Sequence, residues 1–129
     1  MNNTLLIIED NEQNFYMMRF LLEKNGFTVI GAKNGREGVE KALHHKPRAI
    51  LLDIQLPEMD GYAVAAELKK HDEMEGVPII AVTSYAMVGD RERILAAGAN
   101  GYIEKPINPE TFVAEIVRHL QKDRGDKES

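Results

Sequence analysis

The sequence predicts an α/β protein in which five parallel strands form one sheet with helices on both faces. Short apolar runs alternate with segments of helical periodicity, and this alternation is typical of βα units. Runs such as AILL are apolar on both faces of a strand, as the centre of a parallel sheet requires. The length of 129 residues suits one domain.

Each expected strand is one of the apolar runs. They lie at 4–8, 27–32, 48–53, 78–84 and 101–105. The expected helices lie between and after them, at 12–25, 35–45, 61–71, 86–97 and 109–122. Asn25-Gly26 is a natural helix stop, Asp60 is a good N-cap, and Pro109 suits a first helical turn. We expect a domain over 1–122, followed by a polar tail at 123–129 that is disordered or begins a linker.

Composition restricts the possible partners. The chain has 21 acidic and 16 basic residues, and this balance argues against direct binding of nucleic acid. It has no cysteine, so neither a disulfide framework nor a thiolate metal site is possible. It shows no apolar run of membrane-spanning length and no signal peptide, and we expect a cytoplasmic protein.

Polar residues lie at the carboxyl ends of four of the expected strands. Glu9 and Asp10 follow the first, Asp53 ends the third, Thr83 lies in the fourth, and Lys105 ends the fifth. The carboxyl ends of parallel strands share one edge of a sheet, so these residues are expected to converge. Mg²⁺ prefers carboxylates and water, and it would relieve their mutual repulsion. Such a site suits phosphoryl transfer, with Asp53 as the nucleophile.

Two of these residues also have a simpler interpretation when each is taken alone. Asp10 alone would be read as a loop residue or helix N-cap, and Lys105 alone as a solvated surface lysine. Five suitable residues at the ends of four strands favour a joint site instead. The four histidines lie in helical or loop segments away from these ends and are interpreted as solvated.

Four motifs carry a resemblance to a known family. IIEDN (7–11), LLDIQLPEMDG (51–61), AVTSYAM (81–87) and AGANGYIEKPI (97–107) resemble the receiver domain of bacterial two-component response regulators, the CheY-like fold. The match covers about 4–121 and is most similar to single-domain and hybrid-kinase receivers. It implies strand order 2-1-3-4-5. It also implies a phosphorelay protein that is not an enzyme towards other molecules.

The resemblance implies a role for each acidic residue. Asp53 would accept a phosphoryl group from a histidine kinase or a histidine phosphotransfer protein. Asp10 and Asp53 would hold Mg²⁺ directly, Glu9 would act mainly through water, and the backbone carbonyl of Gln55 would be a further ligand. All four residues occur at the matching positions.

The resemblance also implies a switch. Thr83 and Lys105 would contact the phosphoryl group, and the peptide bond before Pro106 would be cis. Thr83 would move toward the phosphoryl group while Tyr102 turns inward, although Tyr102 alone could be a static packing residue. The surface formed by the helix at 86–97, the strand at 101–105 and the last helix would then change its binding to a target protein.

Two positions flank the expected phosphoryl group. Gln55, two residues after Asp53, and Tyr85, two residues after Thr83, would tune how fast water removes the phosphate. Asn14 either braces the site as a buried hydrogen-bonding residue or faces solvent on its helix.

The first expected helix has two apolar stripes. Phe15, Met18 and Leu22 share one, and Met17 and Leu21 share the other. If the second stripe faces the sheet, the first is partly exposed and could dock a helical phosphotransfer partner. Otherwise the helix is simply well buried.

Other functions compete with this one. A flavodoxin-like electron carrier would need a loop that holds a flavin phosphate, and EDNEQ at 9–13 would repel it. A metal-dependent phosphatase would want an acid at Gln55. A pseudo-receiver acting without phosphate, and a receiver that is part of a longer regulator or hybrid kinase, stay open, as does the choice between a monomer and a weak dimer.

Overall fold

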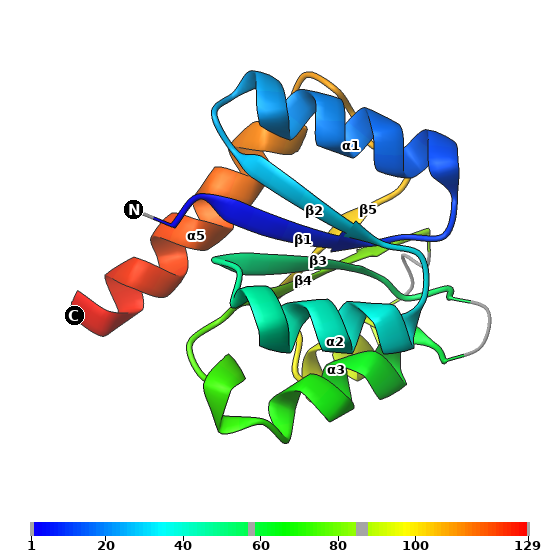
Figure 1. The fold of residues 1–129 in the computed structure, drawn as a ribbon, viewed down its shortest axis with the longest axis vertical. Helices are drawn as coiled ribbons and strands as arrows, with labels where there is room; N and C mark the ends of the chain where they lie inside the picture. Colours follow the sequence, from blue (N-terminus) through cyan, green and yellow to red (C-terminus); the bar gives the residue numbers. More distant parts are fainter. Residues whose placement is uncertain (1, 57–58, 85–87, 129) are drawn as a thin grey trace.

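The computed structural model describes residues 2–56, 59–84 and 88–128, in which strands and helices alternate along the chain (Figure 1). The strands are β1 (Thr4–Ile8), β2 (Thr28–Ala32), β3 (Ala49–Asp53), β4 (Ile79–Thr83) and β5 (Gly101–Glu104). The helices are α1 (Glu12–Lys24), α2 (Gly35–His45), α3 (Gly61–Lys69), α4 (Val88–Ala96) and α5 (Phe112–Glu128), with a short 3-10 helix η1 (Asp72–Met74) before β4. All strand pairs are parallel and the order is β2-β1-β3-β4-β5, so the predicted fold and strand order are confirmed.

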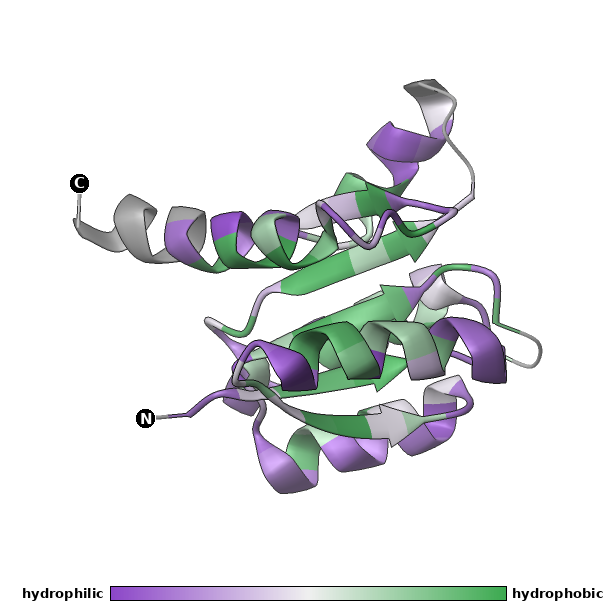
Figure 2. Ribbon diagram, turned by 90° about the horizontal axis from the view of Figure 1, so that it is seen from above, coloured by the Kyte–Doolittle hydropathy of each residue, from purple (hydrophilic) through white to green (hydrophobic). Residues whose placement is uncertain are grey.

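The sheet separates two apolar cores. Successive side chains of β1 point to opposite faces. Leu6 and Ile8 join a cluster with residues of α2, α3 and α4, whereas Leu5 and Ile7 join a cluster with residues of α1 and α5. Figure 1 shows α1 on the opposite side of the sheet from α2 and α3, and Figure 2 shows apolar strands between helices with hydrophilic outer surfaces. Burial on both faces explains why the central strands are continuous apolar runs.

Local signals account for the starts of three helices. Asn11, Asn34 and Asp60 each have extended backbone, and each side chain accepts a hydrogen bond from the backbone three residues ahead at 2.9 Å. Asp60 is thus the predicted N-cap of α3. Each of these bonds satisfies an amide that the first helical turn would otherwise leave unpaired.

The start of α5 was predicted three residues too early. Pro109 lies in a turn, in which the side chain of Asn108 accepts a hydrogen bond from the amide of Glu110 at 2.9 Å. The amide of Phe112 then bonds to the carbonyl of Asn108, also at 2.9 Å, and α5 begins there. An asparagine side chain bonded to the backbone two residues on competes with helix formation, and this explains the delay.

The exposed docking stripe expected on α1 is wrong for two of its three residues. Met18 and Leu22 are fully buried in the core beneath α1, and Phe15 is half-buried with its ring against Gly31. The exposed apolar side chains of α1 are instead Tyr16 and Phe20, at 70% and 57%. The alternative of a well-buried apolar helix face therefore holds.

Two histidines were also misinterpreted. His71 is half-buried, with its Nε2 3.4 Å from Oε2 of Glu67. His119 of α5 is half-buried, and its ring lies directly beside Gly101, where a Cβ atom would meet ring atoms. His44 and His45 are exposed as expected. Glycine at position 101 thus leaves room for an aromatic ring from the helix that follows β5.

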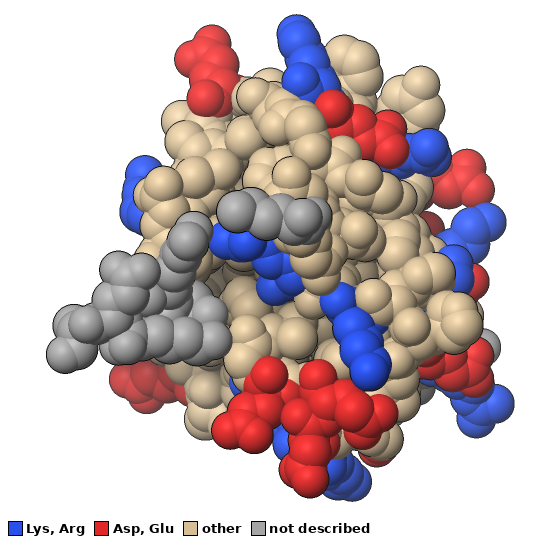
Figure 3. All heavy atoms as spheres, turned by 60° about the vertical axis from the view of Figure 1, so that its left-hand side comes forward, with Lys and Arg blue, Asp and Glu red and all other residues tan. Residues whose placement is uncertain are grey.

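Surface charge is mixed on the side of the molecule where β1 begins. Figure 3 shows this side, with acidic side chains gathered at its lower edge and lysine or arginine side chains spread over the rest. The mixture agrees with the modest net charge of −5.

We predict that Gly61→Ala destabilises the fold. A Cβ atom at Gly61 would lie 2.5 Å from Cα of Ile54 and 2.8 Å from the carbonyl oxygen of Asp53, so backbone would have to move. Overpacking of this kind costs about 1–3 kcal/mol. The matched control is Gly89→Ala in α4, where a Cβ atom meets nothing within 4 Å. This control should gain about 0.5–1 kcal/mol through helix propensity. Urea unfolding of both variants measures the difference, and equal stabilities would contradict the prediction.

Candidate functional site

The predicted residues meet at the carboxyl edge of the sheet because the strand ladders continue to its rim. Thr83 of β4 pairs with Glu104 of β5, and the amide of Lys105 then donates to the carbonyl of Thr83 at 2.8 Å. On the other side, the amide of Glu9 donates to the carbonyl of Ala32 at 3.0 Å. The backbone at both ends of the site is therefore held by the sheet rather than by loose loops.

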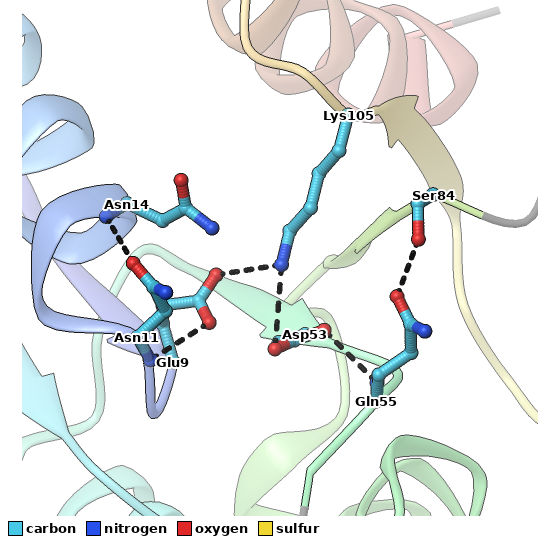
Figure 4. Close-up of polar contacts among 7 residues, drawn as sticks. All are labelled: Glu9, Asn11, Asn14, Asp53, Gln55, Ser84 and Lys105. Carbon is cyan, nitrogen blue, oxygen red and sulfur yellow. Dashed lines mark hydrogen bonds and ion pairs between the residues drawn. The ribbon is translucent and has the colours of Figure 1, made fainter.

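The centre of the site is a lysine between two buried carboxylates (Figure 4). Nζ of Lys105 lies 3.0 Å from Oε1 of Glu9 and 3.4 Å from Oδ2 of Asp53. Glu9 is 2% exposed, Asp53 is 3% exposed and Thr83 is fully buried. Buried carboxylates of this kind require a compensating charge, which the lysine supplies in part. The Lys105–Pro106 peptide bond is cis, as the resemblance implies.

Asp53 is also oriented from its other side. Its Oδ1 accepts a hydrogen bond from the amide of Gln55 at 2.9 Å. The side-chain oxygen of Gln55 in turn accepts a hydrogen bond from the hydroxyl of Ser84 at 2.6 Å (Figure 4). Sequence reasoning placed Ser84 at the end of a strand but did not give it a role. Its only signal was its position directly after Thr83.

The three acidic residues form a group that could hold a metal ion. Glu9, Asp10 and Asp53 each offer a carboxylate oxygen, and these oxygens lie within 4.8 Å of one another. Asp10 is exposed although its neighbour Glu9 is buried. Oε1 of Glu9 is buried and meets Lys105 as an ion pair, without a well-aligned hydrogen bond. Three carboxylates beside one lysine leave excess negative charge, and an oxygen-only ligand set suits a hard divalent cation.

Burial raises the pKa of the Glu9 carboxyl from 4.5 to about 7. Loss of solvation is the largest cause, followed by the hydrogen bonding and negative charge of Asp53. The ammonium group of Lys105 and the amide of Asn11, which donates to Oε2 at 3.2 Å, act in the opposite direction. The protein without metal therefore retains a proton on Glu9 up to near-neutral pH.

Two further predicted residues, Tyr102 and Asn14, are each half-buried. The guanidinium group of Arg91 in α4 lies 4.9 Å from the centre of the Tyr102 ring in β5. The side chain of Asn14 points toward Lys105 (Figure 4). Tyr85 lies outside the described residues.

Comparison with known proteins identifies the family to which this chain belongs. The family model "Response regulator receiver domain" matches residues 5–117. The chain belongs to the response regulator receiver family. Like other receiver domains it is a signalling protein, and it acts in two-component phosphorelay signalling. Its cluster of Glu9, Asp10 and Asp53 fits a metal-binding phosphoacceptor site.

Individual receivers are similar over almost the whole chain. The polar-differentiation response regulator DivK of Brucella anthropi is 44% identical over 120 residues, which cover 93% of this chain and 98% of that protein. The receiver domain of the sensor histidine kinase PA1611 from Pseudomonas aeruginosa is 36% identical with a TM-score of 0.83, covering 97% of this chain and 99% of that one. A CheY-like receiver from Methanospirillum hungatei is 30% identical with a TM-score of 0.86, covering 98% and 99%.

The described part of the receiver contains no helix with both the length and the apolar character needed to cross a bilayer.

We predict that Glu9 makes the stability of this receiver, in the absence of metal, depend on pH. The folded protein binds this proton more tightly than the unfolded chain does, since the folded pKa is about 7 and the ordinary value is 4.5. The contribution of Glu9 to the free energy of unfolding should therefore fall as the pH rises from 4.5 to about 7.

The measurement is urea unfolding with a chelator at several pH values across the window. Glu9→Gln carries no titrating group at this position and is the matched control. The stability of wild type relative to Glu9→Gln should fall with rising pH. A constant difference between the two proteins would contradict the prediction.

Proposed function

We propose that Asp53 is the phosphoacceptor of this receiver domain. The observation that carries the proposal is the ammonium group of Lys105, which lies 3.4 Å from Asp53 and 3.0 Å from Glu9 at the edge of the sheet. A fixed positive charge beside a carboxylate stabilises the charge on phosphoryl oxygens during transfer. Of the two buried carboxylates, Asp53 belongs to β3, which is the neighbour of β4, whereas Glu9 follows β1. Thr83 of β4 carries the hydroxyl that is the proposed second contact to the phosphoryl group.

The transfer exchanges one bond to phosphorus for another. A carboxylate oxygen of Asp53 attacks the phosphorus of a phosphohistidine, the phosphorus–nitrogen bond breaks, and the imidazole leaves with its electron pair and takes up a proton. Lys105 and Thr83 hold the phosphoryl oxygens. The amide of Gln55, at 2.9 Å from Oδ1, keeps the carboxylate of Asp53 oriented during the attack.

Mg²⁺ is the proposed metal. Asp10 and Asp53 would bind it directly, Glu9 would act mainly through water, and the backbone carbonyl of Gln55 would complete the protein ligands. When bound, it would neutralise charge on the phosphoryl oxygens and on the acidic group. The fit rests on the convergence of three carboxylate oxygens within 4.8 Å. The similar receiver domain of PA1611 was solved with a magnesium ion coordinated in its active site cleft.

The proposed partners are a histidine kinase or histidine phosphotransfer protein as donor and a target protein that reads the switched surface. We place that surface on α4, β5 and α5. Ile94 is the one fully buried side chain among the described residues of α4, so this helix has few packing contacts to resist a shift. The receiver phosphorylates and dephosphorylates only itself. Its cytoplasmic location stays a prediction.

We predict that Asp53→Asn abolishes phosphorylation. The amide cannot attack phosphorus, so the mass of the intact protein should not increase by a phosphoryl group after incubation with acetyl phosphate and Mg²⁺. Wild type should gain one such group and lose this ability in excess chelator. The matched control is Asp72→Asn, at an exposed aspartate of η1, which should behave as wild type. Equal phosphorylation of Asp53→Asn would refute the proposal, and an unmodified wild type would instead support a pseudo-receiver.

We predict that Tyr102→Ala separates phosphorylation from output. Tyr102 is half-buried beneath Arg91, whereas the Asp53 carboxylate is held by Lys105 and the amide of Gln55, so loss of the Tyr102 side chain should leave the mass gain intact. Hydrogen exchange should then show that beryllium fluoride with Mg²⁺ no longer changes the protection of α4 and β5. The matched control is Tyr16→Ala, at a tyrosine of α1 that is 70% exposed, which should respond as wild type. A full response in Tyr102→Ala would make Tyr102 a static packing residue.

A further inference from the structure

The hydrogen bond between Ser84 and Gln55 joins two loops at the mouth of the site. Gln55 follows β3 and Ser84 follows β4, and the hydroxyl of Ser84 donates to the side-chain oxygen of Gln55 at 2.6 Å. Both side chains are exposed, whereas Asp53 beneath them is buried. Figure 4 shows the side chain of Gln55 directed toward Ser84 and not over the carboxylate of Asp53. The pair therefore lies on the solvent side of the carboxylate.

Gln55 is tied to Asp53 through its backbone as well. Its amide donates to Oδ1 of Asp53 at 2.9 Å, so the start of the Gln55 side chain cannot move far from the carboxylate. The end of that side chain is free to turn except for its bond to Ser84. One hydroxyl group thus decides where the amide oxygen of Gln55 points.

The direction of this oxygen matters for the loss of a phosphoryl group from Asp53. In hydrolysis, a water oxygen forms a new bond to phosphorus and the bond from phosphorus to the Asp53 oxygen breaks. The carboxylate is restored, and a proton of the water passes to the departing phosphate. The attacking water must lie in line with the breaking bond, and a glutamine amide is a group that can orient such a water. In this structure the amide oxygen accepts a hydrogen bond from Ser84 and is thereby turned away from the carboxylate of Asp53 (Figure 4).

We propose that Ser84 is a positioning residue that slows hydrolysis of the aspartyl phosphate by holding the Gln55 amide oxygen away from the attacking water. The inference rests on the proposed phosphorylation of Asp53. Ser84 acts through Gln55 and not by contact with the reacting atoms. Because the bond is exposed and competes with water, its removal should change the rate by roughly two- to tenfold.

The test measures the first-order loss of phosphoryl from Asp53 after the donor is removed, followed by intact mass. Four variants are compared with wild type: Ser84→Ala, Ser84→Thr, Gln55→Ala, and Ser84→Ala combined with Gln55→Ala. Affinity for beryllium fluoride with Mg²⁺ is measured in parallel, as a readout of phosphoryl binding without hydrolysis. Both side chains are exposed, so the substitutions leave the core intact.

The expected pattern is specific to a role through Gln55. Ser84→Ala should lose phosphoryl faster than wild type by the stated factor. Ser84→Thr keeps the hydroxyl and should restore the slow rate. Gln55→Ala should be no faster than wild type, and adding Ser84→Ala to it should change nothing. The affinity for beryllium fluoride with Mg²⁺ should be the same in Ser84→Ala and wild type.

Several outcomes would overturn the inference while leaving the proposed function intact. One is an unchanged rate of phosphoryl loss in Ser84→Ala, and another is an acceleration by Ser84→Ala that persists when Gln55 is also replaced by alanine. The others are a Ser84→Thr variant that loses phosphoryl as fast as Ser84→Ala, and a loss of affinity for beryllium fluoride in Ser84→Ala. By contrast, a wild type that never gains a phosphoryl group would overturn the proposed function, and this inference with it.

Discussion

The ammonium group of Lys105 lies between two carboxylates that the sheet buries, and the rest of the site depends on this contact. Burying an ion without a partner costs on the order of several kcal/mol of folding free energy. Burial is the largest reason why the pKa of Glu9 rises to about 7, and the one lysine that Glu9 and Asp53 share at 3.0 and 3.4 Å offsets this rise only in part. A site with unbalanced negative charge favours a divalent cation, and the same lysine then remains available to phosphoryl oxygens.

Parallel strands make this arrangement predictable from sequence. A buried strand of such a sheet is a continuous apolar run, and its last residue marks the edge where ligands bind. Glu9, Asp53, Thr83 and Lys105 could therefore be placed at one edge before any distance was known. Ladder bonds such as that from the amide of Lys105 to Thr83 extend this order past the strands, so the polar residues keep the register of the sheet.

The features that sequence reasoning missed depend on contacts between distant segments. Periodicity placed two apolar stripes on α1 but could not choose between them, and packing on the sheet buried Met18 and Leu22. The hydrogen bond from Ser84 to Gln55 joins residues 29 positions apart and has no local signature. Similarly, only the approach of α5 to β5 shows that His119 packs on Gly101.

The division of the interior by the sheet has a consequence for divergence among receivers. Side chains of α1 and α5 pack into one cluster, and those of α2, α3 and α4 pack into the other. Substitutions that refit one layer need few compensating changes in the other, because distant sites contribute almost additively. Gene duplicates of such a chain can thus diverge in the packing of one layer while the other layer, and the chemistry at the edge of the sheet, are inherited unchanged.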